Sequence, residues 1–156
     1  MSKSLKRVQH ALASAGLAID VQEMAAGTRT AEAAAKAVGC TPDQIAKSII
    51  FRGQSSGRAM LFITAGGNQV CAEKARRLAG EDLGKADAAL IRAETGFAIG
   101  GVAPVGHLTP IRAWADPRLF DFDIVYAAAG TPRHIFGIAP GDLLRLSGAA
   151  LAEFTL

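Results

Sequence analysis

Two apolar runs near the middle of the chain constrain its fold more than any other feature. Residues 48–51 (SIIF) and 59–64 (AMLFIT) have the β-branched and aromatic composition of strands. Between them, residues 53–57 (GQSSG) form a turn sequence, so the two runs predict a β-hairpin. Because both runs are almost wholly apolar, we expect the hairpin to lie in the middle of a sheet.

Helix signals lie on both sides of the hairpin. Leu5, Val8 and Leu12 recur at spacings of three and four residues before Gly16, which indicates an amphipathic helix with a glycine stop. Thr30 is the predicted N-cap of a helix over 31–38. The other predicted helices are a short one opened by a Thr41–Gln44 capping box, one over 71–79, one over 87–95 and one that begins at Pro140.

Strand signals are interleaved with these helices. Leu17, Ile19 and Val21 alternate as in a half-buried strand, and three further strands are predicted at 111–115, 124–128 and 135–138. The elements follow no regular βαβ order, so the predicted fold class is mixed α/β (α+β), a mixed sheet with helices packed around it. With 156 residues and no linker or repeat, residues 1–156 are expected to form a single domain.

Composition favours a cytoplasmic globular protein. A net charge of +3 is mildly basic, so it permits a polyanionic partner without requiring one. Cys40 and Cys71 are far apart and belong to no Cys/His cluster, which predicts reduced, buried thiols and no metal site. The basic N-terminus lacks the apolar core of a signal peptide, and no run approaches the ~18 apolar residues of a membrane span.

Lys47 is the first residue that could carry chemistry. It lies between Ile45-Ala46 and the apolar run that begins at Ser48, so its stem should be partly buried. One interpretation is a surface lysine whose ammonium reaches solvent. The other is a cation directed into a cleft, where it could hold a phosphate or stabilise negative charge.

The glycine-rich passage 96–107 is the second candidate. Gly100 and Gly101 lack side chains, so their backbone N–H groups could approach a ligand closely, and Pro104 stiffens the far side. Such a loop could stabilise a carbonyl oxygen that becomes an oxyanion, although an ordinary tight turn has the same composition. The passage is neither a dinucleotide-binding fingerprint nor a P-loop.

His107 and His134 are the acid/base candidates, and each could equally be a structural loop histidine. A serine-hydrolase elbow, Gly-x-Ser-x-Gly, does not occur. The sequence therefore indicates no catalytic triad.

Taken together and in this order, these motifs resemble the YbaK family of bacterial tRNA-editing proteins. That family comprises free-standing relatives of the editing domain inserted in bacterial prolyl-tRNA synthetases. The resemblance covers roughly residues 20–147. It rests on residues 44–51 (QIAKSIIF), 95–107 (TGFAIGGVAPVGH), 127–132 (AAAGTP) and 138–143 (IAPGDL).

The resemblance implies a mixed α/β domain with a strongly curved central sheet. It also implies hydrolysis of the ester between a wrong amino acid and the 3′ end of a tRNA, often tRNA for proline. No cofactor or metal is implied. The expected partner is the aminoacylated 3′ end of a tRNA, with a synthetase as a further candidate. Cysteine, alanine, serine and threonine all remain open as the amino acid removed.

Site roles follow from the same resemblance. Lys47 would hold the phosphate or ribose of the terminal adenosine, and loop 100–104 would anchor the aminoacyl group through its backbone. The residues expected to be catalytic are Lys47, Gly100 and Gly101, and those expected to bind substrate are Thr30, Val102, Ala103, Pro104, His107 and His134. From charge alone, Lys3, Arg7, Arg76 and Arg77 are candidates for contact with the tRNA body.

Two other functions remain open on the sequence. One is a module of the same fold that binds tRNA or an aminoacylated ligand without turnover. The other is a Schiff-base enzyme with Lys47 as nucleophile, which would require a lysine in a dry pocket.

Overall fold

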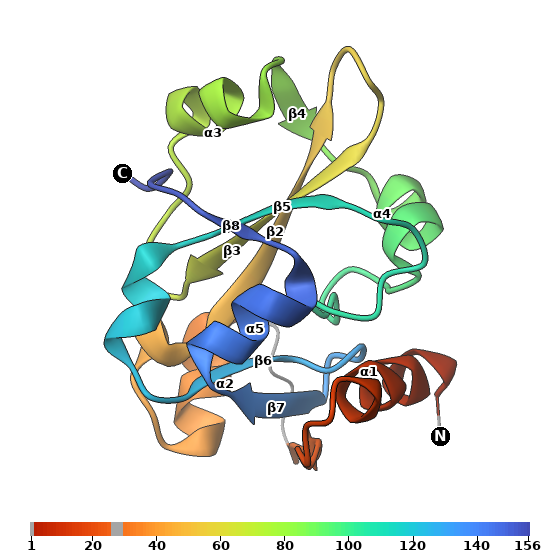
Figure 1. Ribbon diagram of the computed structural model, residues 1–156, viewed down its shortest axis with the longest axis vertical. Helices are drawn as coiled ribbons and strands as arrows, with labels where there is room; N and C mark the ends of the chain where they lie inside the picture. The colour runs from red at the N-terminus through yellow and green to blue at the C-terminus, as the bar shows by residue number, and fades with distance from the viewer. Residues whose placement is uncertain (1, 26–29) are drawn as a thin grey trace.

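The computed structural model describes residues 2–25 and 30–156. Within this part of the chain, helices and strands alternate irregularly along the sequence (Figure 1). The helices are α1 (Lys3–Ser14), α2 (Ala31–Val38), α3 (Ala72–Ala79), α4 (Ala88–Thr95) and α5 (Pro140–Ser147), with 3₁₀ helices η1 (Pro42–Gln44) and η2 (Pro117–Asp121). The strands are β1 (Gln22–Glu23), β2 (Ala46–Gly53), β3 (Ala59–Ala65), β4 (Leu83–Lys85), β5 (Arg112–Ala115), β6 (Val125–Ala128), β7 (His134–Ile138) and β8 (Ala150–Leu151).

The predicted mixed α/β class is confirmed, with the strands arranged in two sheets. The larger sheet has the order β4-β2-β3-β5-β8, and the smaller has the order β1-β7-β6. Strands β2 and β3 form the expected antiparallel hairpin, whereas β3 and β5 run parallel. A single parallel bridge between Ile45 and Tyr126 joins the two sheets.

Local capping explains where the helices beside β2 begin and end. The Thr30 hydroxyl accepts a hydrogen bond from the Ala33 N–H (3.1 Å), and Gly39 ends α2 in the left-handed region, where glycine carries no Cβ penalty. Gln44 Oε1 accepts from the Thr41 N–H (3.3 Å), as the predicted capping box requires. The chain therefore passes through one 3₁₀ turn and enters β2 at Ala46.

The strand predicted over 17–21 is wrong. This segment has no regular structure, and the ladder with β7 includes only Gln22 and Glu23. Leu17, Ile19 and Val21 are partly buried and pack against the main core. The alternation therefore reported apolar packing correctly, but backbone pairing depends on a neighbouring strand that a local pattern does not reveal.

The two faces of the β2–β3 hairpin pack against different clusters. On one face, Leu61 and Ile63 join the main core with the buried side of α1. On the other face, Phe62 stacks on Trp114 with ring centroids 4.9 Å apart, and Phe154 meets it edge-on. β3 is buried along its whole length, which confirms the predicted central position of the hairpin.

Helix α1 fixes the glycine-rich passage from outside. Arg7 Nε donates to the Gly106 carbonyl oxygen (2.9 Å), and its guanidinium lies 4.6 Å from the centroid of the Phe97 ring. His107 Nε2 donates to the Ala103 carbonyl oxygen (2.8 Å), and burial lowers the pKa of His107 below its ordinary value. Arg7 was a candidate for contact with tRNA, and the structure shows that its guanidinium holds the glycine-rich passage.

The described segments contain no helix that is both long and apolar enough to cross a bilayer.

The half-buried ring of His107 should make stability depend on pH. The unfolded chain protonates this residue near its ordinary pKa of 6.5, whereas the folded chain protonates it only at lower pH. The free energy of unfolding should therefore fall as pH drops below 6.5, and His107→Gln should reduce that fall. Urea unfolding of both proteins at about pH 7.5 and about pH 5.5 measures the difference.

His10→Gln is the matched control, because His10 lies exposed on α1. It should retain the wild-type dependence on pH. If the free energy of unfolding falls by the same amount at acid pH in wild type and in His107→Gln, the prediction is contradicted.

Candidate functional site

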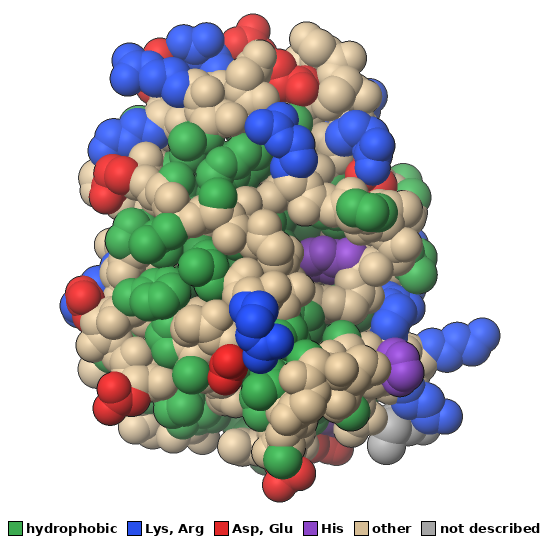
Figure 2. Space-filling model, viewed as in Figure 1, with side chains coloured by type: hydrophobic (Ala, Val, Ile, Leu, Met, Phe, Trp, Pro, Cys, Tyr) green, Lys and Arg blue, Asp and Glu red, His purple; other side chains and the backbone are tan. Residues whose placement is uncertain are grey.

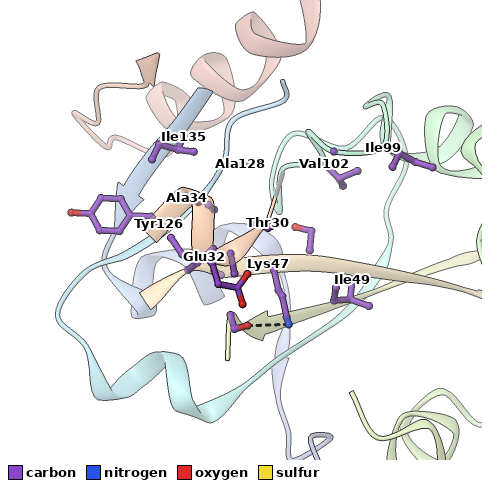
Figure 3. Close-up of a pocket in the computed structure, with 17 residues that line it drawn as sticks. Thr30, Glu32, Ala34, Lys47, Ile49, Ile99, Val102, Tyr126, Ala128 and Ile135 are labelled. Atoms are coloured by element: carbon purple, nitrogen blue, oxygen red, sulfur yellow. Dashed lines mark hydrogen bonds between the residues drawn. The ribbon is translucent and has the colours of Figure 1, made fainter. Parts of the chain in front are cut away.

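A cavity of about 550 Å³ lies where β2 and β6 separate. The two strands are adjacent at the Ile45–Tyr126 bridge and pair no further within the described residues. The N-terminal turn of α2, Gly66 and part of the glycine passage complete the walls (Figure 3). The residues that line it are Thr30, Ala31, Glu32, Ala34, Ile45, Ala46, Lys47, Ser48, Ile49, Gly66, Ile99, Gly100, Val102, Tyr126, Ala127, Ala128 and Ile135.

One edge of β2 faces this cavity. The Gly53 N–H donates to the Arg58 carbonyl oxygen (2.9 Å), and alternate residues of an antiparallel strand direct their backbone groups to the same neighbour. Odd-numbered residues of β2 therefore bond to β3, and Ser48 directs its N–H and C=O to the opposite edge. Strand β4 pairs with that edge only from Phe51 onward, so Ser48 has no ladder partner there within the described residues.

Lys47 lies in the wall of the cavity and is held in a defined position. Its Nζ donates to the Asn68 carbonyl oxygen (2.6 Å) and to the Gly66 carbonyl oxygen (3.2 Å), the second of which is drawn as a dashed line in Figure 3. An ammonium has three N–H donors, so one remains for a ligand. Among the described residues, no carboxylate lies within ion-pair distance of Lys47, so its charge is not neutralised by a side chain.

A buried carboxylate positions those two carbonyl groups. Asp116 is 2% exposed and accepts hydrogen bonds from the Ala65 N–H (3.1 Å) and from Asn68 Nδ2 (2.9 Å). Asp43 accepts from the Gly67 N–H (2.8 Å) in the same turn. The turn that follows β3 is therefore fixed with its carbonyl oxygens directed at Lys47.

Only part of the glycine loop lines the cavity. Gly100 and Val102 line it, and within the described residues neither N–H has a hydrogen-bond acceptor. The Gly101 N–H, by contrast, donates to the Ala98 carbonyl oxygen (3.1 Å). A Cβ at Gly101 would lie 2.6 Å from the Thr131 carbonyl carbon, so glycine there permits close packing of two loops. The N–H groups without an acceptor are therefore those of Gly100 and Val102, on either side of Gly101.

The other residues expected to bind substrate occupy different positions. Ala103 and Pro104 are buried next to the lining residue Val102 but do not line the cavity. His107 and His134 do not line it either. His134 Nδ1 lies 2.6 Å from Thr131 Oγ1, and its Nε2 lies 3.8 Å from a carboxylate oxygen of Glu23. Both histidines therefore have structural partners outside the cavity.

Thr30 lines the cavity, but its hydroxyl already accepts the capping hydrogen bond of α2. Glu32 and Ser48, which the sequence did not single out, also belong to the lining. Glu32 extends its carboxylate from the first turn of α2 (Figure 3), and Ser48 follows Lys47 in β2. A signal for Ser48 was present in the sequence, since it is the single polar residue at the start of an apolar strand run. Asp116 has no such signal, because its partners lie about fifty residues earlier in the chain.

No group of three or more His, Cys, Asp or Glu side chains in the described part of the chain could hold a metal ion. Cys40 and Cys71 are free thiols, as predicted, but they are partly exposed, whereas full burial was expected.

The candidate tRNA-contacting basic residues do not form one patch. Lys3 and Arg7 belong to α1, and Arg76 and Arg77 belong to α3, which lies at the opposite end of the molecule (Figure 1). Basic side chains on this face are correspondingly separated (Figure 2). Arg76 and Arg77 also pair with Glu73 on their own helix, at 2.7 and 3.3 Å.

Comparison with known proteins places this geometry in a family. Residues 25–146 match the family described as "Aminoacyl-tRNA editing domain". The chain is 30% identical to the uncharacterized protein YwhH of Bacillus subtilis over 128 residues, which covers 82% of this chain and 81% of that protein.

Solved structures agree over the whole chain. A candidate trans-editing enzyme for prolyl tRNA synthetase is 46% identical, with a TM-score of 0.92 over 100% of this chain and 99% of that one. The hypothetical protein APE2540 is 25% identical, with a TM-score of 0.87 over 96% of this chain and 99% of that one. The chain therefore belongs to the aminoacyl-tRNA editing domain family.

Proposed function

We propose that this protein is a free-standing hydrolase that deacylates mischarged tRNA. The observation that carries the proposal is an unneutralised ammonium on one side of the cavity and unpartnered backbone N–H groups on another. A cation suits the nucleotide part of an aminoacyl-tRNA, and N–H donors suit its ester carbonyl. Membership of the editing family and the likeness to a candidate trans-editing enzyme support the same activity.

In the proposed mechanism, Lys47 holds the phosphate or ribose of the terminal adenosine with its remaining N–H. The N–H groups of Gly100 and Val102 polarise the ester carbonyl and stabilise the oxyanion that forms when water attacks. An aminoacyl ester is already activated, so positioning and electrostatic stabilisation can supply much of the rate enhancement without a side-chain base. This agrees with the positions of His107 and His134 outside the cavity lining.

The size of the cavity suits this substrate. A volume of about 550 Å³ admits an amino acid with part of a nucleoside, and larger side chains would be excluded. Transfer RNA for proline is the leading candidate, because the 46% identical structure is described as serving prolyl tRNA synthetase. The partner is then the aminoacylated 3′ end of that tRNA, with a synthetase as a further candidate.

A Schiff-base role for Lys47 is disfavoured. Lys47 as a residue is partly exposed and its Nζ donates to two carbonyl oxygens, whereas a nucleophilic lysine needs an unprotonated nitrogen in a dry pocket.

Lys47→Ala should reduce kcat/KM by about 10²-fold, which is typical for the loss of one key electrostatic group. The assay measures release of alanine, serine, threonine and cysteine from mischarged tRNA for proline. Lys36→Ala is the matched control, because Lys36 is exposed at the other end of α2 and does not line the cavity. Full activity of Lys47→Ala would remove Lys47 from the mechanism. Salt-sensitive tRNA binding without any hydrolysis by the wild type would instead indicate a binding module.

Gly101→Ala should lower kcat by about 10- to 10²-fold. The added Cβ would displace the loop, and with it the Gly100 and Val102 N–H groups that are proposed to contact the ester. Gly141→Ala is the control, since a Cβ there meets no atom within 4 Å. Circular dichroism should establish that both variants keep the fold. Wild-type kcat in a folded Gly101→Ala protein would show that the loop position does not matter for the reaction.

A further inference from the structure

Ser48 carries a buried hydroxyl that the proposed mechanism does not use. Its Oγ is shielded from solvent and has no hydrogen-bond partner, although Ser48 lines the cavity. Burying a hydroxyl without a partner costs free energy, so native proteins rarely leave one unpaired. An unpaired hydroxyl in the wall of a cavity is therefore a candidate for contact with a ligand.

The strand places this hydroxyl on the opposite face of β2 from the Lys47 side chain. Successive side chains of a strand point to opposite faces. Ala46 and Ile50 pack in the main core, together with Val102, whereas Ile49 and Phe51 pack against the Phe62 cluster. Ser48 alternates with Ala46 and Ile50, so its side chain faces the glycine loop.

On this side of β2 the cavity is largely apolar. The side chains there include Ala46, Val102, Ala127, Ala128 and Ile135. The Thr30 hydroxyl accepts the capping hydrogen bond of α2 and keeps its O–H donor, and the ring of Tyr126 points away from the cavity (Figure 3). Ser48 thus supplies a hydroxyl without a hydrogen-bond partner within a largely apolar compartment, an arrangement that can select one hydrogen-bonding group on a ligand.

We propose that Ser48 selects a small amino acid with a side-chain hydroxyl, so that seryl or threonyl esters are hydrolysed in preference to alanyl esters. This inference rests on the proposed function, which assigns the nucleotide to Lys47 and the ester carbonyl to the glycine loop. The side chain of the amino acid then extends beyond the loop, into the compartment that Ser48 faces. A ligand hydroxyl can both donate to and accept from Ser48, whereas an alanyl methyl group leaves the Ser48 hydroxyl unpaired.

The test compares two esters that differ by one hydroxyl group. Seryl and alanyl esters of the same tRNA for proline are hydrolysed by wild type and by Ser48→Ala. The wild type should prefer the seryl ester by about 10-fold or more in kcat/KM, because a site built for a hydroxyl rejects the analogue that lacks it. Ser48→Ala should lose this preference by slower hydrolysis of the seryl ester, with the alanyl ester unchanged or faster.

Two further variants separate this role from a general loss of structure. Ser48→Thr retains the hydroxyl and should keep the direction of the preference. Ser14→Ala removes an exposed hydroxyl on α1 and should leave both rates unchanged. Equal loss on both esters in Ser48→Ala would overturn the proposal, because the hydroxyl would then serve the ester, the amino group or the ribose. Equal rates for the two esters in the wild type would also overturn it.

Binding of two amide analogues distinguishes failure of this inference from failure of the proposed function. Seryl and alanyl groups joined to 3′-amino-3′-deoxyadenosine cannot be hydrolysed as esters, so their Kd values report recognition alone. If no ester is hydrolysed, the proposed function fails. Tighter binding of the seryl amide by about 10-fold would still support the role of Ser48, and equal Kd values would overturn it.

Discussion

Strand β2 has β6 as its neighbour near its start and β4 as its neighbour near its end. The cavity lies beside the residues between these two contacts. The strand meets β6 at the Ile45–Tyr126 bridge and meets β4 only from Phe51 onward. A strand edge closed inside a dry core would leave buried N–H and C=O groups unpaired, at a substantial cost in free energy. Here that edge opens on a cavity of about 550 Å³, where water or a ligand can complete the hydrogen bonds. The position of the site thus follows from how the two sheets are joined.

The charge at this edge is fixed by groups that are distant in the sequence. Lys47 is held by the turn after β3, and that turn is held by Asp116, which follows β5. A lysine stem has many rotamers, so two carbonyl acceptors restrict the position of the ammonium before any ligand arrives. The side-chain entropy of the lysine is therefore lost during folding and not during binding. A preorganised electrostatic site requires this order. Asp116 therefore acts on the site without lining it.

Local patterns predicted much of the fold, because caps and apolar periodicity act over a few residues. Thr30, the Thr41–Gln44 capping box and the β2–β3 hairpin are confirmed. The strand expected at 17–21 failed because alternation reports burial and not pairing. At the site, Lys47, Gly100, Val102 and Thr30 were predicted and line the cavity, whereas His107 and His134 do not. The hydrogen bond that occupies the Gly101 N–H, and the role of Asp116, depend on tertiary contacts that no local pattern encodes.

The alternation of side chains along β2 separates the two roles proposed for Lys47 and Ser48. Lys47 and Ser48 are neighbours in the chain, yet their side chains leave opposite faces of the strand. One face supplies a cation held by main-chain carbonyls, and the other supplies a hydroxyl in an apolar compartment. Replacement of Ser48 by alanine removes no hydrogen bond of the Lys47 ammonium, since the two side chains share no hydrogen-bond partner. In the proposed mechanism, the choice of amino acid and the grip on the end of the tRNA therefore depend on different side chains of one strand.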